Sequence, residues 1–463
     1  MGKLPHPYMP NSVESLKEEM LEEIGVEHID ELYRDIPENY MLNKPLDIPE
    51  GRPEQEVKEE IERILAKNKS TDEFLTFLGA GCWPHYIPAA VLDLVRRTEF
   101  LTSYTPYQPE ISQGMLQALF EYQSLICELT GMDVANSSMY DWSTAAGEAV
   151  LMAVRHTRRR SVLVPETVGP ERLATIKTYA EPSSIQVEKV KYVKDTGQLD
   201  LEDLKRKLDE EIAAVYIENP TYLGFLETQV EEISEEAHRK GALFIVGVDP
   251  LSLGVVKPPG EYGADIVVGE GQPLGIPMSY GGPLLGIFAC RDDRRLLRQM
   301  PGRIIGMTTT ISGEERGFCM ALQTREQHIR REMATSNICT NEALCAVTAA
   351  IYLALIGPQG LRELGETVME RVHYAITLLS EIEGLKTPLF DAPHFKEFTV
   401  NVDEANVRIS DLHDKLFEEG IQGGKILCKD FPELGETALY CVTELHSRED
   451  IDRLASTLER LLK

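Results

Sequence analysis

The stretch that decides the fold reads Gly269-Glu270-Gly271-Gln272-Pro273-Leu274-Gly275-Ile276-Pro277-Met278-Ser279-Tyr280-Gly281-Gly282-Pro283. An apolar run, Leu243 to Val248, lies upstream of it and ends in Asp249. A second short run, Asp265 to Val268, leads into the glycines. The order strand, aspartate, strand and glycine-rich loop predicts a ligand site at the carboxyl ends of parallel strands, where Asp249 and Gln272 would meet.

The residues before this stretch alternate between strand and helix patterns. Continuous apolar runs predict strands, and helices with one apolar face separate them. The predicted strands are 161–164, 185–193, 213–217, 243–248, 265–268 and 285–289, and the predicted helices are 115–130, 171–179, a helix beginning at 201, and 230–237. This βαβ alternation predicts an α/β fold around a mostly parallel sheet that is covered on both faces.

Three regions follow from these patterns. Residues 1–75 predict an N-terminal helical arm, in which Asn11 and Glu14 form a capping box, Gly25 ends the first helix, and a second helix covers about 54–67. The large α/β domain is predicted over residues 76–340. It contains a polar stretch, 307–331, near its end. Residues 341–463 predict linking helices, interrupted at Gly357-Pro358, and a small α+β domain.

The composition excludes several classes of protein. Lys and Arg number 47 against 76 Asp and Glu, for a net charge of -29, which argues against a nucleic-acid partner. No run approaches the ~20 apolar residues of a membrane span. The eight cysteines are scattered without metal-ligand spacing. We therefore expect a reduced, cytoplasmic protein without a metal site.

Two loops carry candidate functional side chains. The segment 77–88 places small residues beside Trp83, His85 and Tyr86, which suits a tight loop near a ligand or partner. His85 by itself is also compatible with an ordinary buried histidine. The segment 104–114 holds Tyr104, Tyr107 and Gln108 between two prolines.

Polar residues elsewhere have two interpretations each. Ser143 and Thr144 begin a predicted helix, whose N-terminus can bind an anion such as a cofactor phosphate, or they are plain caps. Arg303 and Arg331 can bind a carboxylate or phosphate, or form surface ion pairs.

Taken together, these motifs resemble the glycine cleavage system P-protein family, in particular its subunit 1 type, the N-terminal half of glycine dehydrogenase (decarboxylating). The resemblance covers nearly the whole chain. It is carried by Phe77-Leu78-Gly79-Ala80-Gly81, Thr105-Pro106-Tyr107-Gln108-Pro109-Glu110-Ile111-Ser112-Gln113-Gly114, Gly269 to Gln272 with Gly281-Gly282-Pro283, and Ala334-Thr335-Ser336-Asn337-Ile338-Cys339-Thr340.

The resemblance implies a pyridoxal-phosphate-dependent transferase fold of the aspartate aminotransferase type (fold type I) in a split enzyme with an α2β2 assembly. Subunit 2 would carry pyridoxal phosphate on a lysine. This chain has Gln272 at that position, and a carboxamide nitrogen is not nucleophilic enough to form the imine. Gln272, Asp249, Ser143 and Thr144 would then form a degenerate cofactor site, in which Asp249 occupies the place of the aspartate that pairs with the pyridine nitrogen.

The family places its working site near the subunit interface. This chain is therefore expected to contribute Tyr104, Tyr107 and Gln108 as catalytic residues, with His85 and Arg303 as candidates for the substrate channel. The implied activity is decarboxylation of glycine and transfer of the aminomethyl group to the lipoyl arm of the H-protein.

Two other hypotheses remain open from the sequence. The chain could be an enzyme complete in itself if another lysine, such as Lys257 or Lys425, held the cofactor, although both are poorly placed. Alternatively, the chain could be a purely structural partner that stabilises a catalytic subunit and touches no ligand.

Overall fold

The chain forms two compact units in the computed structural model, residues 1–69 and 70–463. The structure describes residues 5–463 except 43, 72, 104 and 339. The boundary differs from the predicted end of the arm at 75. Strand β1 (Leu75–Thr76) belongs to the second unit, where it pairs in parallel with β12 (Ile421–Gln422).

The first unit is helical and has no buried residue among those described between 5 and 69. Its helices are the 3-10 turns Pro10–Ser12, Ile29–Tyr33 and Glu38–Tyr40, with α1 (Glu14–Ile24) and α2 (Glu54–Leu65). The predicted Asn11 cap is wrong. Pro10 opens a separate turn that contains Asn11, so α1 begins at Glu14 with Val13 before it. Gly25 ends α1 as predicted, in the left-handed region at φ 82°.

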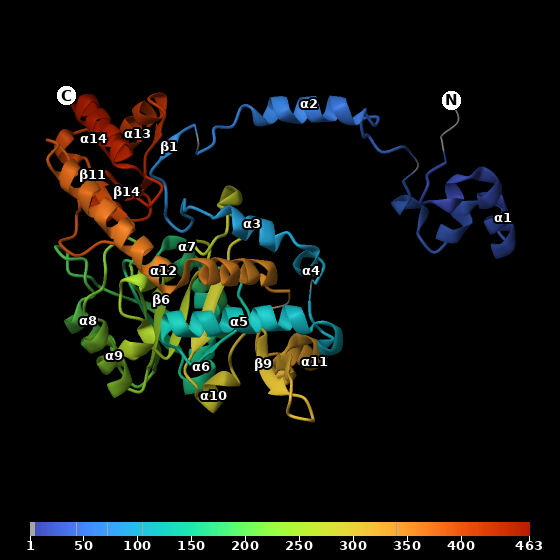
Figure 1. The fold of residues 1–463 in the computed structure, drawn as a ribbon, viewed down its shortest axis with the longest axis horizontal. Coiled ribbons are helices and arrows are strands. Elements are labelled where there is room, and N and C mark those ends of the chain that lie inside the picture. The colour runs from blue at the N-terminus through green and yellow to red at the C-terminus, as the bar shows by residue number, and fades with distance from the viewer. Residues whose placement is uncertain (1–4, 43, 72, 104, 339) are drawn as a thin grey trace. The chain divides into compact units, whose positions relative to one another are not determined.

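The second unit is built on a seven-stranded sheet with the order β2-β8-β7-β6-β5-β3-β4 (Figure 1). Strands β3 to β7 run parallel, and β8 and β2 pair antiparallel at one end. The strands are β2 (Val134–Ala135), β3 (Ser161–Pro165), β4 (Gln186–Val190), β5 (Ile212–Glu218), β6 (Leu243–Val248), β7 (Ile266–Glu270) and β8 (Gly286–Cys290). The predicted α/β fold with a mostly parallel sheet is confirmed.

Helices cover both faces of this sheet. Successive strand residues point to opposite faces, so Phe244 and Val246 join one core cluster and Ile245 the other. Helices α6 and α7 cover one face of the sheet. Helices α5, α9 and α12 cover the opposite face. The helices before the small domain are α3 (Ala89–Val95), α4 (Thr98–Leu101), α5 (Gln113–Thr130), α6 (Trp142–Thr157), α7 (Pro170–Ala180), α8 (Leu201–Lys207), α9 (Val230–Arg239), α10 (Arg294–Leu297) and α11 (Gln327–Arg330).

The polar stretch after residue 306 contains a hairpin that the sequence analysis missed. Strands β9 (Ile304–Thr309) and β10 (Arg316–Ala321) pair antiparallel, with Ile305 opposite Met320. Gln123 of α5 holds this hairpin, since its side chain both donates to the Ile305 carbonyl and accepts from the Ile305 amide, each at 2.9 Å. Strand β9 is buried only at Ile304 and Ile305 and exposed from Met307 on, and only β10 alternates, which explains why the strand pattern was weak.

Helix α12 (Ala343–Ser380) links the sheet to the small domain. Gly357 interrupts it with φ 62° and ψ 179°, just before Pro358. By length and composition, α12 is the one helix among the described residues that could cross a membrane. Half of its apolar window is buried inside the protein, where α12 packs on α3 and α5. It is therefore a core helix of the second unit.

The small α+β domain follows α12. Its three-stranded antiparallel sheet has the order β11-β14-β13. The elements are β11 (Glu397–Asn401), α13 (Ile409–Glu418), β12, β13 (Lys425–Ile426), β14 (Thr437–Cys441) and α14 (Arg448–Leu462). Contacts made by the residues at the start of β11 bring the small domain onto the carboxyl ends of the parallel strands, which positions the site described next.

Candidate functional site

Gln272 is buried, and its side-chain amide is bonded to main-chain groups. Its carbonyl oxygen accepts from the Trp83 amide at 3.0 Å. Its nitrogen donates to the carbonyls of Trp83 at 3.2 Å and Ile276 at 2.8 Å. A carboxamide both donates and accepts, so it can hold a peptide group from both sides. Gln272 therefore fastens the 77–86 loop to the glycine-rich stretch.

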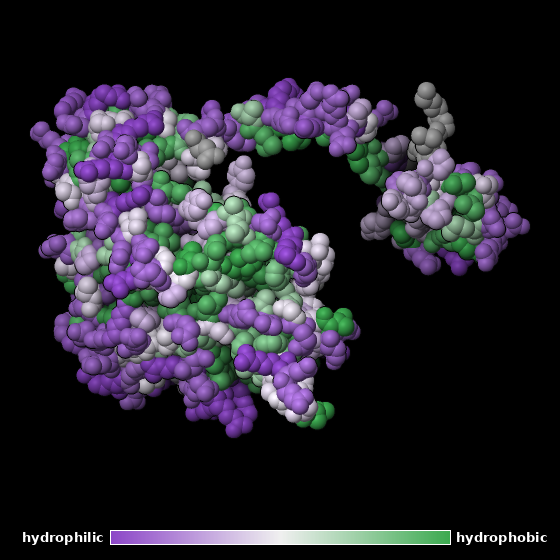
Figure 2. Space-filling view, in the orientation of Figure 1, coloured by the Kyte–Doolittle hydropathy of each residue, from purple (hydrophilic) through white to green (hydrophobic). Residues whose placement is uncertain are grey.

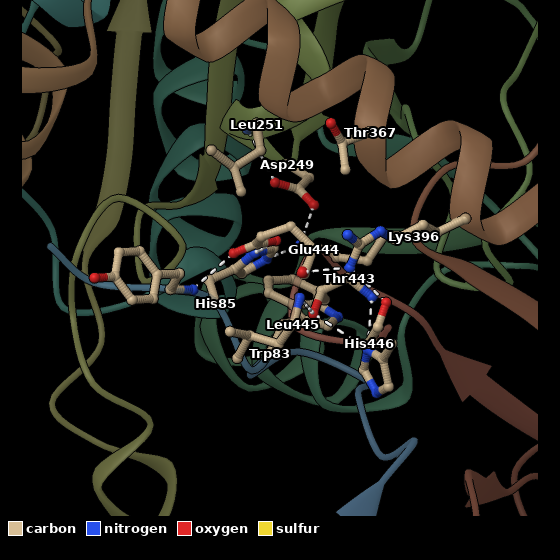
Figure 3. Close-up of polar contacts among 12 residues, drawn as sticks. Trp83, His85, Asp249, Leu251, Thr367, Lys396, Thr443, Glu444, Leu445 and His446 are labelled. Atoms are coloured by element: carbon tan, nitrogen blue, oxygen red, sulfur yellow. Dashed lines mark hydrogen bonds and ion pairs between the residues drawn. The ribbon is translucent and has the colours of Figure 1, made fainter. Parts of the chain in front are cut away.

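Asp249, at the carboxyl end of β6, forms an ion pair with Lys396 of the small domain (Figure 3). Both side chains are almost fully buried, at 6% and 2% exposure. The Lys396 ammonium also lies 3.2 Å from Nε2 of His85 and 3.8 Å from the centre of the Trp83 ring. An aspartate, an imidazole nitrogen and an aromatic face thus surround one buried cation.

His85 continues this chain of contacts toward the small domain. Its Nδ1 lies 2.8 Å from the Glu444 carboxylate, which also accepts from the Tyr86 amide at 2.6 Å. Burial lowers the pKa of His85, and the neighbouring Lys396 lowers it further, so the ring is neutral at neutral pH. With Lys396 donating to Nε2, the ring proton sits on Nδ1 and is donated to Glu444. We call Trp83, His85, Asp249, Gln272 and Lys396 the buried network.

The start of α6 lies beside the buried network and is capped by the chain itself. Asp141 accepts from the Thr144 amide at 2.7 Å, and the Thr144 hydroxyl is bonded back to Asp141. The Trp142 amide donates to Glu270 at 3.2 Å, and Glu270 also accepts from the amides of Gln272 and Leu285 at 3.0 and 2.9 Å. Thr144 thus serves as part of a helix cap, and Ser143 stands next to it, partly exposed.

These residues do not fit a pyridoxal phosphate. The imine position is an amide bonded to backbone, and the partner that a pyridine nitrogen would need, Asp249, is already paired with Lys396. The helix amides that would face a phosphate already donate to side chains of this chain, Thr144 to Asp141 and Trp142 to Glu270, so they are not free to bind one. Asp249, Gln272 and Lys396, taken as whole residues, are also at most 4% exposed, so the place is filled.

The lysines considered from the sequence lie elsewhere. Lys257 is about half exposed and pairs with Glu231 at 2.7 Å. Lys425 is partly exposed, on β13, with Asp430 3.8 Å away. The lysine that does reach Asp249, Lys396, was missed. The sequence signal for it was a charged pair, Lys396-Glu397, placed between Phe395 and Phe398 at the start of an apolar run.

Tyr107 and Arg303, predicted from separate motifs, come together at a second place. Arg303 donates to the Tyr107 hydroxyl at 3.1 Å, and its guanidinium lies 5.2 Å from the centre of that ring. Both residues line an open cavity of about 500 Å³. The remaining lining residues are Glu326, Gln327, His328, Arg331, Glu332, Asn337 and Ile338. We call this the Tyr107 cavity.

Arg303 is the best-anchored cation of the Tyr107 cavity. It is 8% exposed and also donates to Asn341, which in turn donates to Ser137 and Ser138. Arg325 supports the preceding turn, since its guanidinium donates to the carbonyls of Met300 and Gly302. A fixed guanidinium beside a phenol, with Arg331 and His328 near it, is suited to holding a carboxylate.

The other predicted residues fall in different places. Gln108 is exposed and is not among the residues that line the Tyr107 cavity. Tyr104 lies outside the described residues. His85 lies in the buried network and not with Tyr107 and Arg303.

The second unit also has an apolar surface. Figure 2 shows green residues gathered over α3 and α12 of the second unit. Helix α12 packs against α3, α4 and α5. Large exposed side chains on these elements and their connections are Tyr86, Leu94, Leu101, Ile111 and Leu355.

Comparisons with known proteins agree with this architecture. A family model described as glycine cleavage system P-protein matches residues 6–458. A protein of Staphylothermus marinus named "Probable glycine dehydrogenase (decarboxylating) subunit 1" is 53% identical, over 99% of this chain and 98% of its own length.

Solved structures give the same result. The crystal structure of a glycine decarboxylase (P-protein) of the glycine cleavage system, in inhibitor-bound form, matches with a TM-score of 0.88 and 41% identity over the whole of both chains. A NifS-like protein matches with a TM-score of 0.62 at 15% identity, over 84% of this chain and 99% of its own, which supports the fold alone. The fold is that of fold type I pyridoxal-phosphate enzymes, and the resemblance seen in the sequence is confirmed: the chain belongs to the glycine cleavage system P-protein family.

Proposed function

We propose that this chain is the subunit without the cofactor lysine in a two-subunit glycine decarboxylase, active only with subunit 2. The observation that carries the proposal is Gln272, whose amide is buried and bonded on both sides to backbone. Such a group cannot form an imine, so the reactive aldehyde has to be held by another chain. The name subunit 1, which the relatives bear, supports the existence of that partner.

In this proposal the Tyr107 cavity faces the active site of the partner. A pyridoxal phosphate on the partner would supply the electron sink for loss of carbon dioxide from glycine. Arg303 and Tyr107 would orient a carboxylate at the edge of that site. The assembly would be α2β2, would pass the aminomethyl group to the lipoyl arm of the H-protein, and would be cytoplasmic.

The exposed apolar side chains on α4, on α12 and in the turn before α5 support a partner subunit at this position. Leu101 and Leu355 are 51% and 52% exposed, and Ile111 is 81% exposed. Several large exposed apolar side chains of this kind are typical of protein interfaces. Replacing Leu101 or Leu355 by Glu is therefore expected to prevent assembly while the isolated chain stays folded.

Reconstitution tests the proposal. We expect no release of carbon dioxide from glycine by the purified full chain with added pyridoxal phosphate and oxidised lipoyl H-protein. Adding subunit 2 should produce the activity. Turnover by this chain alone would refute the proposal.

The same assay separates a shared site from a purely structural partner. Tyr107→Phe and Gln108→Ala are made in the assembled complex. Loss of turnover with assembly intact indicates a contribution to the site, whereas unchanged turnover in both variants favours the structural role.

A further inference from the structure

The buried network and the start of α6 beside it have the arrangement of polar groups expected of a filled ligand site. At one end a cation, Lys396, faces the Asp249 carboxylate. Beside the network, Asp141 and Glu270 accept hydrogen bonds from the amides of Thr144 and Trp142 at the start of α6. Burial raises the pKa of Glu270 to about 8, so Glu270 occupies this place mainly as a hydrogen-bond acceptor and not as a charge. A pyridoxal phosphate has its groups in the same order, with a protonated ring nitrogen at one end and phosphate oxygens that accept hydrogen bonds at the other.

The Lys396 ammonium has three donors, and the network provides three partners. They are the Asp249 carboxylate, the Nε2 atom of His85 at 3.2 Å, and the face of the Trp83 ring at 3.8 Å. A buried lysine without such partners would lose its proton or destabilise the fold. Here the cation is fully surrounded, so it is a permanent part of the site.

The backbone around Lys396 is specialised for this position. Lys396 has φ 63°, in the left-handed region that non-glycine residues rarely adopt. Its carbonyl accepts from the Val442 amide at 2.8 Å. The next residue, Glu397, accepts from the Ala80 amide at 2.6 Å. The bend in the chain thus aims Lys396 into the large domain while Glu397 holds the 77–86 loop.

We propose that Lys396 is a built-in substitute for the cofactor's ring cation, and that this ion pair with Asp249 turns the former cofactor site into a lock between the small and large domains. Asp141 and Glu270 take the place of the phosphate, and Gln272 takes the place of the imine lysine. This site binds no pyridoxal phosphate, not even without a covalent bond. The inference concerns this chain's own residues and stands whether or not the assembled enzyme acts on glycine.

A double-mutant cycle tests the lock in the full chain. Lys396→Met leaves the Asp249 carboxylate buried and unpaired, and Asp249→Asn does the same to the Lys396 ammonium. Each single variant should lower the melting temperature by several degrees. The double variant should lose clearly less than the sum of the two, because neither charge remains. The matched control is Lys257→Met, which removes an exposed ion pair and should leave the melting temperature nearly unchanged.

Additive losses in the cycle, or a loss for Lys396→Met no larger than that for Lys257→Met, would overturn the lock.

A second measurement needs no variant. The chain has two tryptophans, and both lie here: Trp83 in the network and Trp142 at the start of α6. Their fluorescence therefore reports on this site.

The probe is pyridoxine 5′-phosphate, which lacks the aldehyde and cannot react with surface lysines. Titrated into the full chain, it should leave the tryptophan fluorescence unchanged apart from the linear loss caused by its own absorbance. Saturable quenching with one site per chain would show that the site is open to the cofactor, and would refute the substitution.

Discussion

The buried network and the Tyr107 cavity both contain an arginine or lysine beside an aromatic ring, yet they differ in what the cation faces. Lys396 is paired with Asp249, His85 and Trp83 and is closed off from solvent. Arg303 donates hydrogen bonds to Asn341 and to Tyr107. Together with Tyr107 it lines an open cavity of about 500 Å³. A cation that its own chain encloses on every side is not accessible to a ligand, whereas one that lines an open cavity is.

Replacing Gln272 by a lysine tests whether the buried network is closed to further groups, and it has the largest expected effect. Gln272→Lys removes the bonds to Trp83 and Ile276 and buries a second cation near Lys396. We expect it to cost about 3–5 kcal/mol of unfolding free energy, the range for an uncompensated buried charge. Denaturant unfolding of the full chain measures this cost, and Gln108→Lys, at an exposed position, serves as the control, within about 0.5 kcal/mol of the parent.

The same variant should gain no absorbance of an internal aldimine when mixed with pyridoxal phosphate. Appearance of that band in Gln272→Lys, and not in the parent chain, would mean that only the amine was missing, and the closed description of the network would be wrong.

Low pH should lower the free energy of unfolding through His394, a buried residue two positions before Lys396. Burial lowers the pKa of His394 from 6.5 to about 4, although its Nδ1 donates to the Ala392 carbonyl. The unfolded chain then binds the proton first, so stability is complete above pH 6.5 and falls as the pH drops toward 4. The loss should reach at most about 3 kcal/mol.

Unfolding free energies measured across this pH range, for the parent and for His394→Gln, check this expectation. The variant should lose less stability than the parent on acidification. Parallel curves for the two proteins would assign the acid sensitivity to other groups.

Arg303→Met tests the open character of the Tyr107 cavity. A hydrogen bond to a charged group contributes about 1.5–3 kcal/mol, so kcat/KM of the assembled enzyme should fall roughly tenfold to a hundredfold. Arg316→Met, on the exposed face of the β9–β10 hairpin, is the control and should leave kcat/KM unchanged. A normal kcat/KM for Arg303→Met in an intact complex would remove the cavity from the working site.

Tyr107→Phe is the mildest change to the same cavity. It removes one hydroxyl, which accepts from Arg303, and keeps the ring over the guanidinium. The net value of such a bond is about 0.5–1.5 kcal/mol, so kcat/KM should fall roughly two- to tenfold. An effect larger than that of Arg303→Met would indicate that the hydroxyl itself contacts the reacting groups.

Much of the fold was accessible from the sequence because it rests on apolar runs. The strands from β3 to β8 and the kink at Gly357 produce local patterns, and the chain follows them. The β9–β10 hairpin was missed, since only its inner residues are buried. The Asn11 cap was wrong because Pro10 starts its own turn. These errors arise where a local pattern is weak or two local signals compete.

Only part of the candidate site could be predicted from the sequence. Gln272 and Asp249 could be found from the order of strands and glycines, and Tyr107 and Arg303 from their motifs. The partners that determine their roles come from far along the chain: Lys396 lies 147 positions from Asp249, and Glu444 lies 359 positions from His85. Nothing local announces such pairs, because they depend on how the small domain packs on the sheet.

The most direct test of the central claim, that this chain holds no cofactor, is to locate the pyridoxal phosphate in the assembled enzyme. Borohydride reduction fixes an imine to its lysine, and peptide mass spectrometry then identifies the residue. The account predicts a stoichiometric phosphopyridoxyl group on a lysine of the partner subunit and none on this chain. A stoichiometric adduct on any lysine of this chain, Lys396 included, would contradict it.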